Sequence, residues 1–291
     1  MLTCPPLGLP VWHKGKVREA FDLGDRLLLV ATDRLSAFDV VFPDGIPGKG
    51  RVLNQLSALW FEATRHLVVN HFITLDLSDL GLPPEIEREL FGRAMIVTKC
   101  RRIDVECIVR GYLAGSGWKE YCQSGTVAGI PLPPGLSLNS QLPEPIFTPA
   151  LKNDTGHDVN VTQQEMADRF GRDLTERLVS ASLDLYRFAS AKAAQVGIIL
   201  ADTKFEFGLL GEELLLIDEI FTPDSSRYWP LEAYTTGKPI DSLDKQPIRD
   251  YVESIGWDKK PPAPKLPPEI ISAASHRYET VLKKLSAVLA V

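Results

Sequence analysis

The stretch VECIVRGYLAGSG, residues 105–117, brings Arg110 to the end of an apolar run and follows it with three glycines and Ser116. The apolar run predicts a β-strand, and a strand needs neither the arginine nor the glycines. Glycine lets a backbone approach a ligand closely, and arginine presents a planar fork that matches phosphate. We therefore expect Arg110 and Ser116 to bind an anion. The stretch TPDSSRYWP, residues 222–230, adds Arg227 and two serines as donors, although a purely structural role for an arginine–serine pair stays open.

Three cations occupy alternate positions in KGKVRE, residues 14–19. If this segment is a strand, Lys14, Lys16 and Arg18 share one face, because side chains alternate with a period of two. Like charges repel unless an anion joins them, and Gly15 leaves room for a close approach. This arrangement favours a polyphosphate site. The alternative is an exposed edge strand that is protected by its charges.

The stretch DTKFEFGLLGEELLLIDEI, residues 202–220, predicts two strands that carry acids among strong strand formers. With a turn at residues 210–212, even-numbered residues would oppose each other, which places Glu206 opposite Asp218. Two facing carboxylates need a proton or a cation between them, and Mg²⁺ takes one or two carboxylates together with substrate phosphates. Lys204 shares the face of Glu206 and would meet a further anion. The alternative is a surface hairpin that carries its acids by chance.

Two common nucleotide-binding motifs fail in this sequence. DGIPGKGR, residues 44–51, follows Pro43 where a P-loop needs its first glycine, and it has Gly50 where serine or threonine is needed. GSGW does not extend to the glycine fingerprint of dinucleotide-binding folds. A bound nucleotide would therefore use another framework. The loop LKNDTGHDVNV, residues 151–161, holds Asp154 near a histidine, and its spacing does not indicate a nucleophilic triad.

The composition is typical of a globular protein: 44% of the 291 residues are hydrophobic and 24% are charged. The formal net charge of −6 argues against a nucleic-acid partner, which needs a broad basic face, but a few placed cations suffice for small anions. The four cysteines form no C-x-x-C pair, so we expect reduced thiols in a cytoplasmic protein. We expect neither a signal peptide nor a membrane span, because no apolar run reaches ~18 residues.

The predicted elements begin with a sheet-rich part. Apolar and β-branched runs predict strands at residues 16–22, 26–32, 37–42, 93–100 and 104–112. Helical spacing of apolar residues predicts a helix over residues 51–69. The proline-rich residues 131–149 are expected to be irregular.

The second part begins with helices. Thr162 and Glu165 fit a capping box, and a long helix is expected at 173–196, with Asp173 and Glu176 placed like a second cap and Gly197 as its stop. Strand, strand, turn and strand are expected over 198–220, and an amphipathic helix near 269–290. Sheet, helices and hairpin in this order predict an α+β fold with two lobes rather than alternating βαβ units.

These stretches, taken in their order, resemble the SAICAR synthetase (phosphoribosylaminoimidazole-succinocarboxamide synthase) family of purine biosynthesis. The resemblance runs from about Gly15 to Pro230 and is carried by GKVRE, ATDRLSAFD, VECIVRGYLAGSGW, FTPALKNDTGHD, ADTKFEFG and IDEIFTPDSSRYWP. Each stretch alone is weak, but their order is specific. Glu19 departs from the family pattern, where aspartate is more usual, and the C-terminal part adds little.

The resemblance implies an ATP-dependent ligase that joins L-aspartate to the carboxylate of carboxyaminoimidazole ribotide (CAIR), with Mg²⁺, and releases ADP and phosphate. It also implies a two-lobed ATP-grasp or kinase-like architecture. A nucleotide-binding lobe is expected at residues 1–103, a substrate- and metal-binding lobe at 104–291, and the active site in the cleft between them. A carboxylate is a poor electrophile, so we expect it to become an acyl phosphate before the amine attacks.

The resemblance further implies roles for individual residues. ATP contacts are expected from Lys14, Gly15, Lys16, Arg18 and Glu106. Substrate contacts are expected from Asp33, Arg110, Ser116 and Arg227. Glu206 and Asp218 are the expected Mg²⁺ ligands, and catalysis near the reacting carboxylate is expected from Lys204 and Asp154.

Two alternatives stay open from the sequence. One is an ATP-dependent carboxylate–amine ligase with a different acceptor, and the other is a catalytically silent nucleotide-binding protein. The oligomeric state is not fixed by any of these features, and we favour a monomer.

Overall fold

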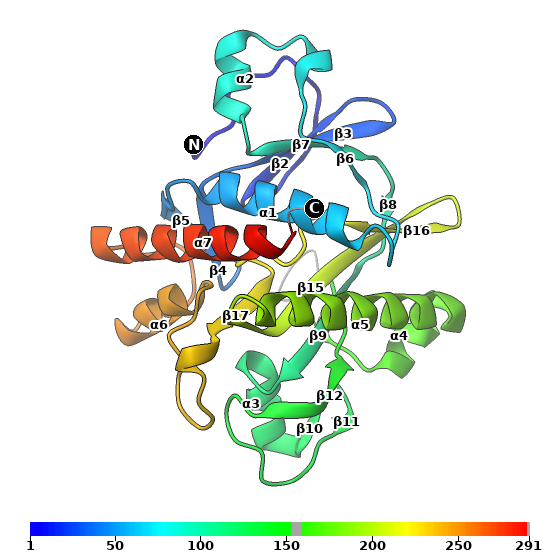
Figure 1. Ribbon diagram of the computed structural model, residues 1–291, viewed down its shortest axis with the longest axis vertical. Coiled ribbons are helices and arrows are strands. Elements are labelled where there is room, and N and C mark those ends of the chain that lie inside the picture. Colours follow the sequence, from blue (N-terminus) through cyan, green and yellow to red (C-terminus); the bar gives the residue numbers. More distant parts are fainter. Residues whose placement is uncertain (153–158, 290–291) are drawn as a thin grey trace.

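A computed structural model describes residues 1–152 and 159–289 (Figure 1). The predicted α+β class is confirmed, since antiparallel sheets are covered by separate helices. The first sheet has the order β1-β2-β3-β7-β6, and its strands are β1 (Val11–Lys14), β2 (Arg18–Asp22), β3 (Arg26–Ala31), β7 (Ala94–Thr98) and β6 (Phe72–Thr74). Around this sheet lie the hairpin β4 (Arg34–Ala37) and β5 (Val40–Gly45), and the helices α1 (Lys49–Thr64), η1 (Ser78–Leu80) and α2 (Pro84–Leu90).

The second sheet is built around two long central strands, β9 (Val105–Tyr112) and β15 (Ile198–Leu210). Their neighbours are β8 (Arg101–Arg102), β12 (Gln141–Phe147), β13 (Ala150–Leu151), β16 (Glu213–Ile217) and β17 (Ser226–Pro230), and β14 (Val159–Asn160) pairs with β13 at the edge. The other elements are α3 (Gly115–Ser124), β10 (Thr126–Val127), β11 (Ile130–Pro131), α4 (Gln163–Phe170), α5 (Arg172–Ala194), η2 (Leu231–Ala233), α6 (Gln246–Ser254) and α7 (Pro268–Leu289).

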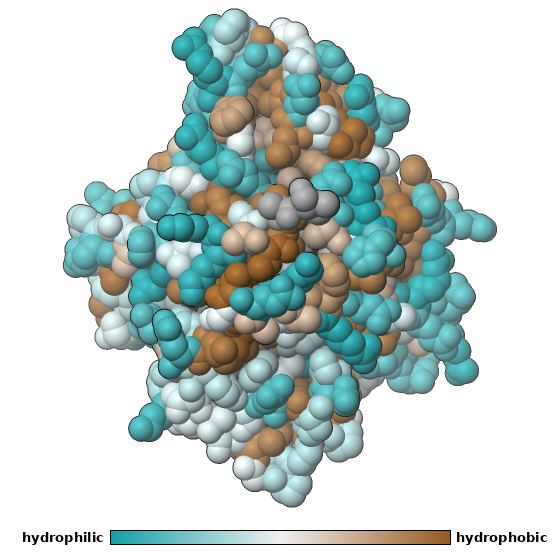
Figure 2. Space-filling model, in the orientation of Figure 1, coloured by the Kyte–Doolittle hydropathy of each residue, from teal (hydrophilic) through white to brown (hydrophobic). Residues whose placement is uncertain are grey.

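One hydrophobic core joins the two sheets. Trp60 of α1, Val97 of β7, Cys107 of β9 and Val281 of α7 belong to the same buried cluster. In Figure 1, α1 and α7 lie side by side across the middle of the molecule, and α5 runs below them. Figure 2 shows apolar side chains gathered on this face over the same region, with hydrophilic residues around them.

The C-terminal helices also pack on the N-terminal hairpin. Ile248 and Val252 of α6 and Ala274 of α7 form a buried cluster with Leu35 and Phe42 of β4 and β5. Residues after 240 therefore contact elements that come before residue 50. The division into lobes at residue 103 stays a prediction, and these contacts tie its two parts together.

Two of the expected strands differ from the structure. Residues 37–42 were predicted as one strand, but they contain the turn between β4 and β5, where Phe38 (φ 52°) and Asp39 (φ 63°) are left-handed. Left-handed non-glycine residues give no turn signal in the sequence, so this prediction was wrong. Residues 131–149 were predicted to be irregular, but β12 pairs with β9 through a register shift. Prolines are tolerated in such an irregular edge strand.

The predicted helices are largely confirmed. The capping box of Thr162 and Glu165 is present at the start of α4, and α5 covers most of the predicted 173–196. The prediction that Asp173 caps α5 was wrong, because Gly171 is the cap residue and no side chain caps this helix. α1 ends at Thr64, five residues before the predicted end at residue 69.

The register of β15 and β16 also differs from the prediction. β15 is one continuous strand, and Leu210 pairs with Glu213 across a two-residue turn. Glu206 therefore lies opposite Ile217 and not opposite Asp218. Even-numbered residues face odd-numbered ones, so the predicted register was wrong by one residue.

The remaining expectations concern cysteines and membrane spans. All four cysteines are free thiols, as predicted. Within the described ranges, no helix has both the length and the apolar character needed to cross a membrane.

Candidate active site

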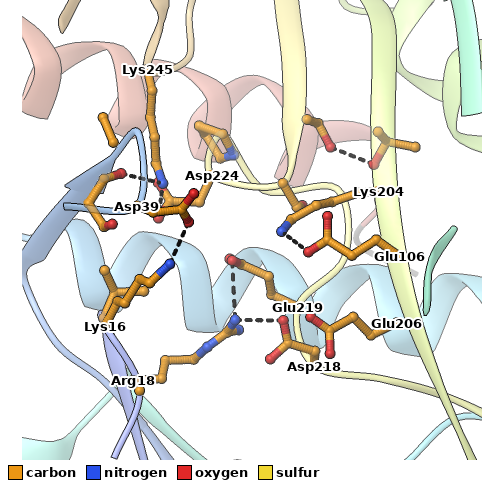
Figure 3. Close-up of a pocket in the computed structure, with 18 of the residues that line it drawn as sticks. Lys16, Arg18, Asp39, Glu106, Lys204, Glu206, Asp218, Glu219, Asp224 and Lys245 are labelled. Carbon is orange, nitrogen blue, oxygen red and sulfur yellow. Dashed lines mark hydrogen bonds and ion pairs between the residues drawn. The ribbon is translucent and has the colours of Figure 1, made fainter. Parts of the chain in front are cut away.

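A polar cavity of about 750 Å³ lies where the two sheets meet. Its walls come from the β1–β2 loop, the β4–β5 turn, β9, β15, the segment after β16 and the start of α6. Figure 3 shows Lys16 and Arg18 of the first sheet on one side and Lys204, Glu106 and Glu206 of the second sheet on the other. This volume suits one or more small-molecule ligands.

The centre of the cavity holds alternating cations and carboxylates from the second sheet. Lys204 Nζ lies 2.6 Å from Glu106 Oε1, and Lys152 Nζ lies 2.7 Å from Glu206 Oε1. Burial alone would lower the pKa of Lys204, but the charges of Glu106 and Glu206 outweigh it and hold that pKa above its usual range. Lys204 is therefore a fixed positive charge in the cavity.

Asp218 joins this group in spite of the register. It follows the last residue of β16 and has a left-handed backbone, with φ 68°, so its side chain does not continue the alternation of the strand. Figure 3 shows its carboxylate beside that of Glu206. Arg18 Nη2 donates to Asp218 Oδ2 at 2.7 Å and to Glu219 Oε1 at 3.2 Å. Burial raises the pKa of Asp218, Arg18 opposes this, and the nearby Glu206 carboxylate raises it further.

An arginine cluster, defined here as Arg110, Arg227 and Asp202, forms a second part of the wall. Arg110 Nη1 lies 3.4 Å from Asp202 Oδ2, and Arg227 Nη1 donates to the same oxygen. Arg110 also donates to Ser116 Oγ at 3.1 Å. Two guanidinium groups share one carboxylate, so the cluster carries one surplus positive charge next to the cavity. The sequence prediction that Arg110, Ser116 and Arg227 meet at one place is confirmed.

Of the three glycines after Arg110, Gly111 lies in β9, and Gly115 and Gly117 lie at the start of a helix rather than in a loop. α3 begins at Gly115, and Ser116 lies in its first turn and lines the cavity. Free backbone N–H groups at a helix N-terminus favour anions, which adds to the charge of the arginines. A Cβ at Gly115 would lie 2.7 Å from Arg227 Nη2, so this glycine leaves room for the arginine.

The three cations of KGKVRE do not share a strand face, so that part of the prediction was wrong. β1 ends at Lys14, Gly15 and Lys16 lie in the loop, and β2 starts at Arg18. Gly15, Lys16 and Arg18 line the cavity, whereas Lys14 does not line it and lies 3.9 Å from Glu19. Lys16 pairs with Asp39 of the β4–β5 turn at 2.5 Å. Nothing in this placement supports Lys14 as a nucleotide contact.

Of two further residues from the sequence prediction, one lies away from the cavity and the other lies outside the described residues. Asp33 is buried away from it and accepts hydrogen bonds from the Met1 amino group, Arg93 and the Gly50 N–H. These partners indicate a structural anchor and give no support for a substrate contact. Asp154 lies outside the described residues.

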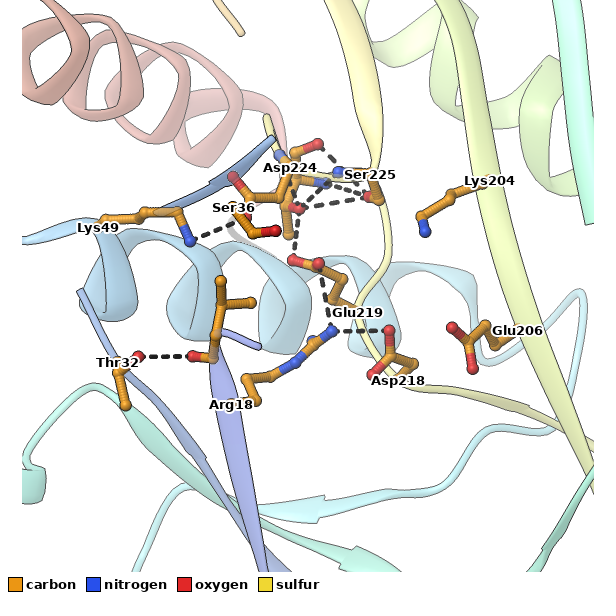
Figure 4. A network of polar contacts seen from close by, with 12 residues as sticks. Arg18, Thr32, Ser36, Lys49, Lys204, Glu206, Asp218, Glu219, Asp224 and Ser225 are labelled. Carbon is orange, nitrogen blue, oxygen red and sulfur yellow. Dashed lines mark hydrogen bonds and ion pairs between the residues drawn. The ribbon is translucent and has the colours of Figure 1, made fainter. Parts of the chain in front are cut away.

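A lysine cluster, defined here as Lys49, Lys245 and Asp224, was not predicted from the sequence. Lys49 Nζ and Lys245 Nζ each lie 2.8 Å from Asp224 Oδ2, and Lys245 lines the cavity (Figures 3 and 4). Lys49 stands in the stretch that fails the P-loop test. Lys245 directly precedes α6. The apolar residues Ile248 and Val252 of this helix are spaced four residues apart, and this spacing could have predicted the helix from the sequence.

The cavity places cations around a carboxylate-rich centre. Such an arrangement is typical of enzymes that act on anionic substrates. The family model of SAICAR synthetase matches residues 11–264. The phosphoribosylaminoimidazole-succinocarboxamide synthase of Desulfosudis oleivorans is 51% identical over 283 residues, which is 96% of each chain.

Solved structures agree with this match. The SAICAR synthase of Saccharomyces cerevisiae, complexed with SAICAR, superposes with a TM-score of 0.88 at 37% identity, over 99% of this chain and 98% of that one. A SAICAR synthetase in complex with ADP superposes with a TM-score of 0.70 at 25% identity, over 95% of this chain and 97% of that one. The chain belongs to the SAICAR synthetase family, a family of ligases in purine biosynthesis, and the resemblance seen in the sequence is confirmed.

Proposed function

We propose that this cavity joins L-aspartate to the carboxylate of CAIR at the expense of ATP and releases SAICAR, ADP and phosphate. The observation that carries the proposal is the charge pattern of one wall. The arginine cluster and Ser116 offer surplus positive charge for a ribotide phosphate, and Lys204 offers a fixed cation nearby for a carboxylate. Arg110 and Lys204 stand on paired strands, opposite Asp202 and Ile108 respectively, so one small molecule can contact both.

The ATP phosphates are proposed to lie against the other wall. Lys16 reaches this side of the cavity from the β1–β2 loop and Arg18 from the start of β2, and Gly15 precedes Lys16 in the same loop. A relative in complex with ADP supports a nucleotide in the family cavity. Glu106 lies beneath Lys204, so its first effect is to fix that lysine, and an ATP contact by Glu106 stays a prediction.

Glu206 and Asp218 fit a Mg²⁺ ion by the chemistry of their donors. Both offer hard carboxylate oxygens to the cavity, and the raised pKa of Asp218 reflects burial and the neighbouring Glu206 charge that a cation would relieve. Among the described residues, no three candidate ligands form a complete metal site, which matches an ion that takes part of its ligands from substrate phosphates. When bound there, Mg²⁺ would supply charge neutralisation for the transferred phosphoryl group.

The proposed chemistry has two stages. The CAIR carboxylate first attacks the terminal phosphorus of ATP, which gives an acyl phosphate and ADP. The aspartate amine then attacks the activated carbon, and phosphate leaves. The protein's part is to hold three anions together, and the cations on both walls offset their repulsion.

The test is an ADP-release assay with CAIR and ATP, first without L-aspartate and then with it. We expect continuous turnover only after aspartate is added, and little turnover with other amino acids. A different amino acid that supports faster turnover would identify a ligase with another acceptor. ADP release that is independent of CAIR would contradict the proposal.

Glu206 and Asp218 both face the cavity, which argues against a silent nucleotide-binding protein. A cytoplasmic monomer also stays part of the proposal.

A further inference from the structure

The lysine cluster places two buried ammonium groups on one carboxylate oxygen. Lys49 is fully buried and does not line the cavity, whereas Lys245 faces it with a side chain that is 11% exposed. Tyr278 of α7 donates to the other oxygen of Asp224 at 2.6 Å. Asp224 carries one negative charge and can neutralise only one of the two lysines. The hydrogen bond from the Tyr278 hydroxyl further weakens the attraction of Asp224 for the lysines. This arrangement disfavours the presence of both ammonium charges.

The groups around Lys245 set its pKa, and so determine how readily this lysine loses its proton. Burial lowers the pKa of Lys245, the charge of Asp224 raises it, and the charge of Lys49 lowers it again. Together they bring the pKa of Lys245 to about 8. From β4, the neutral Ser36 carbonyl accepts a hydrogen bond from Lys245 Nζ at 3.3 Å. The charged and titratable groups around this site are Asp224 and Glu219 from the segment after β16, Lys49 from α1, Tyr278 from α7, and Asp244 and Arg249 from its own segment.

The second stage of the proposed reaction needs a group with this property. At neutral pH the amine of aspartate is an ammonium, which has no lone pair and cannot attack a carbonyl carbon. A base in the cavity must take its proton, and a base works best when its pKa lies near the working pH. Burial next to a second cation is a known way to give lysine such a pKa.

We propose that Lys245 is the general base that takes a proton from the aspartate amine during attack on the acyl phosphate, an inference that rests on the proposed function. Lys245 Nζ takes one proton from the aspartate ammonium, and the freed lone pair of the nitrogen forms a bond to the activated carbon. The bond from that carbon to the phosphate oxygen breaks, and phosphate leaves with the electron pair and takes up the second proton that the nitrogen loses as the amide forms. Lys49 and Asp224 then hold Lys245 in a position to release the proton.

Other groups along the cavity are less suited to this step. Lys204 and Lys152 each contact carboxylates that raise their pKa above the usual range, so both stay protonated. Arg110 and Arg227 are guanidinium groups, which do not lose a proton in proteins. His13 lines the cavity beside the Lys16 loop and is the main alternative base.

The test separates the two stages with hydroxylamine, a nucleophile that is unprotonated at neutral pH and needs no base. Wild-type enzyme with CAIR, Mg²⁺ and ATP should form the hydroxamate with hydroxylamine and SAICAR with aspartate. Lys245→Arg keeps the positive charge but cannot accept a proton. In this variant, aspartate-dependent turnover should fall at least ~100-fold, while hydroxamate formation stays within ~3-fold of wild type.

Three results would overturn the inference alone, and a fourth would overturn it together with the proposed function. Lys245→Arg could keep aspartate turnover within ~10-fold of wild type, or it could lose both reactions equally with an unchanged melting temperature. His13→Gln could reproduce the selective loss of the aspartate reaction. A wild-type enzyme that forms neither SAICAR nor hydroxamate would remove the proposed function together with this inference. The first three results would leave the proposed function in place.

A second variant keeps the inference testable if Lys245→Arg does not fold. Wild-type turnover with saturating aspartate should rise with pH through about 8, as Lys245 becomes neutral. Lys49 lowers the pKa of Lys245, so Lys49→Met should move this rise to higher pH. A merely structural role for the cluster would reduce turnover at every pH by the same factor, and that outcome would contradict a general base at Lys245.

Discussion

The arginine cluster and the lysine cluster share one layout. In each, two cations from different segments meet at the Oδ2 atom of a single aspartate, Asp202 or Asp224. In each cluster the aspartate neutralises one of the two cations, so one surplus positive charge remains next to the cavity. By charge count alone the two clusters would be interchangeable.

The difference lies in the type of cation and in its burial. An arginine stays protonated at any working pH, so its cluster keeps the positive charge that the proposed phosphate site needs. A lysine can lose its proton when it is buried beside another cation, so its cluster can accept a proton. Asp224 is also the more buried aspartate, with a side chain that is 2% exposed against 13% for Asp202. The same layout can thus bind an anion in one place and transfer a proton in another.

The largest effect is expected from removing the charge of Asp224. Asp224→Asn leaves Lys49 buried without a carboxylate, which should reduce the free energy of unfolding by ~3–5 kcal/mol. Asp202→Asn should cost less, because its arginines border the open cavity. Chemical denaturation of both variants at neutral pH measures the two losses. Equal losses would contradict the view that burial sets the two clusters apart.

The pH dependence of the Asp224 variant gives a second check. Burial favours the neutral acid, but Lys245 and Lys49 hold the pKa of Asp224 well below its usual range. A lowered pKa in the folded state stabilises the protein above the unfolded pKa of ~3.9, and this stability is lost as the pH falls below that value. The gap in stability between wild type and Asp224→Asn should therefore narrow in acid, below about pH 4.

A smaller effect is expected at the arginine cluster. Arg227→Met removes one charge-assisted contact to the proposed ribotide phosphate, which is worth ~1.5–3 kcal/mol, so CAIR affinity should fall roughly 10–100-fold. The loss should be the same from about pH 7 to pH 9, because arginine does not titrate there and the phosphate is fully ionised. Calorimetric titration with CAIR and, separately, with ATP measures it. A loss that varies with pH, or that falls mainly on ATP, would contradict the assignment.

Much of this arrangement was predictable from residue type and order. Arg110, Ser116 and Arg227 meet in space although Arg227 is far along the chain, and glycines and polar donors marked both of their stretches. Apolar periodicity was enough to find α5, α7, β9 and the β2–β3 hairpin. These elements depend on local patterns, which a single sequence contains.

What failed depends on backbone details that side-chain patterns do not encode. The turn after Leu210 has two residues, and this shifts the register by one and moves Asp218 out of line with Glu206. Only the left-handed backbone of Asp218 brings its carboxylate back to the site. The lysine cluster is a long-range contact among α1, the segment after β16 and the start of α6, and no local motif joins these segments.

The smallest effect is expected from a substitution at Gly115. This substitution tests whether CAIR binding depends on the exact position of the arginine cluster. Gly115 has φ 56°, and a Cβ there would lie 2.7 Å from Arg227 Nη2, the flexible end of a side chain. Gly115→Ala should cost ~1–2 kcal/mol in stability from the left-handed backbone and should also push Arg227 aside, with CAIR affinity reduced ~3–10-fold. Gly125 ends the same helix with φ 71° and has nothing within 4 Å of its Cβ position. Gly125→Ala is therefore the matched control: it should cost similar stability and leave CAIR affinity unchanged. Melting temperature and CAIR titration on both variants separate backbone strain from displacement of the arginine. Equal CAIR affinity in the two variants would show that the cluster tolerates the shift, and that phosphate binding depends on its charge more than on its geometry.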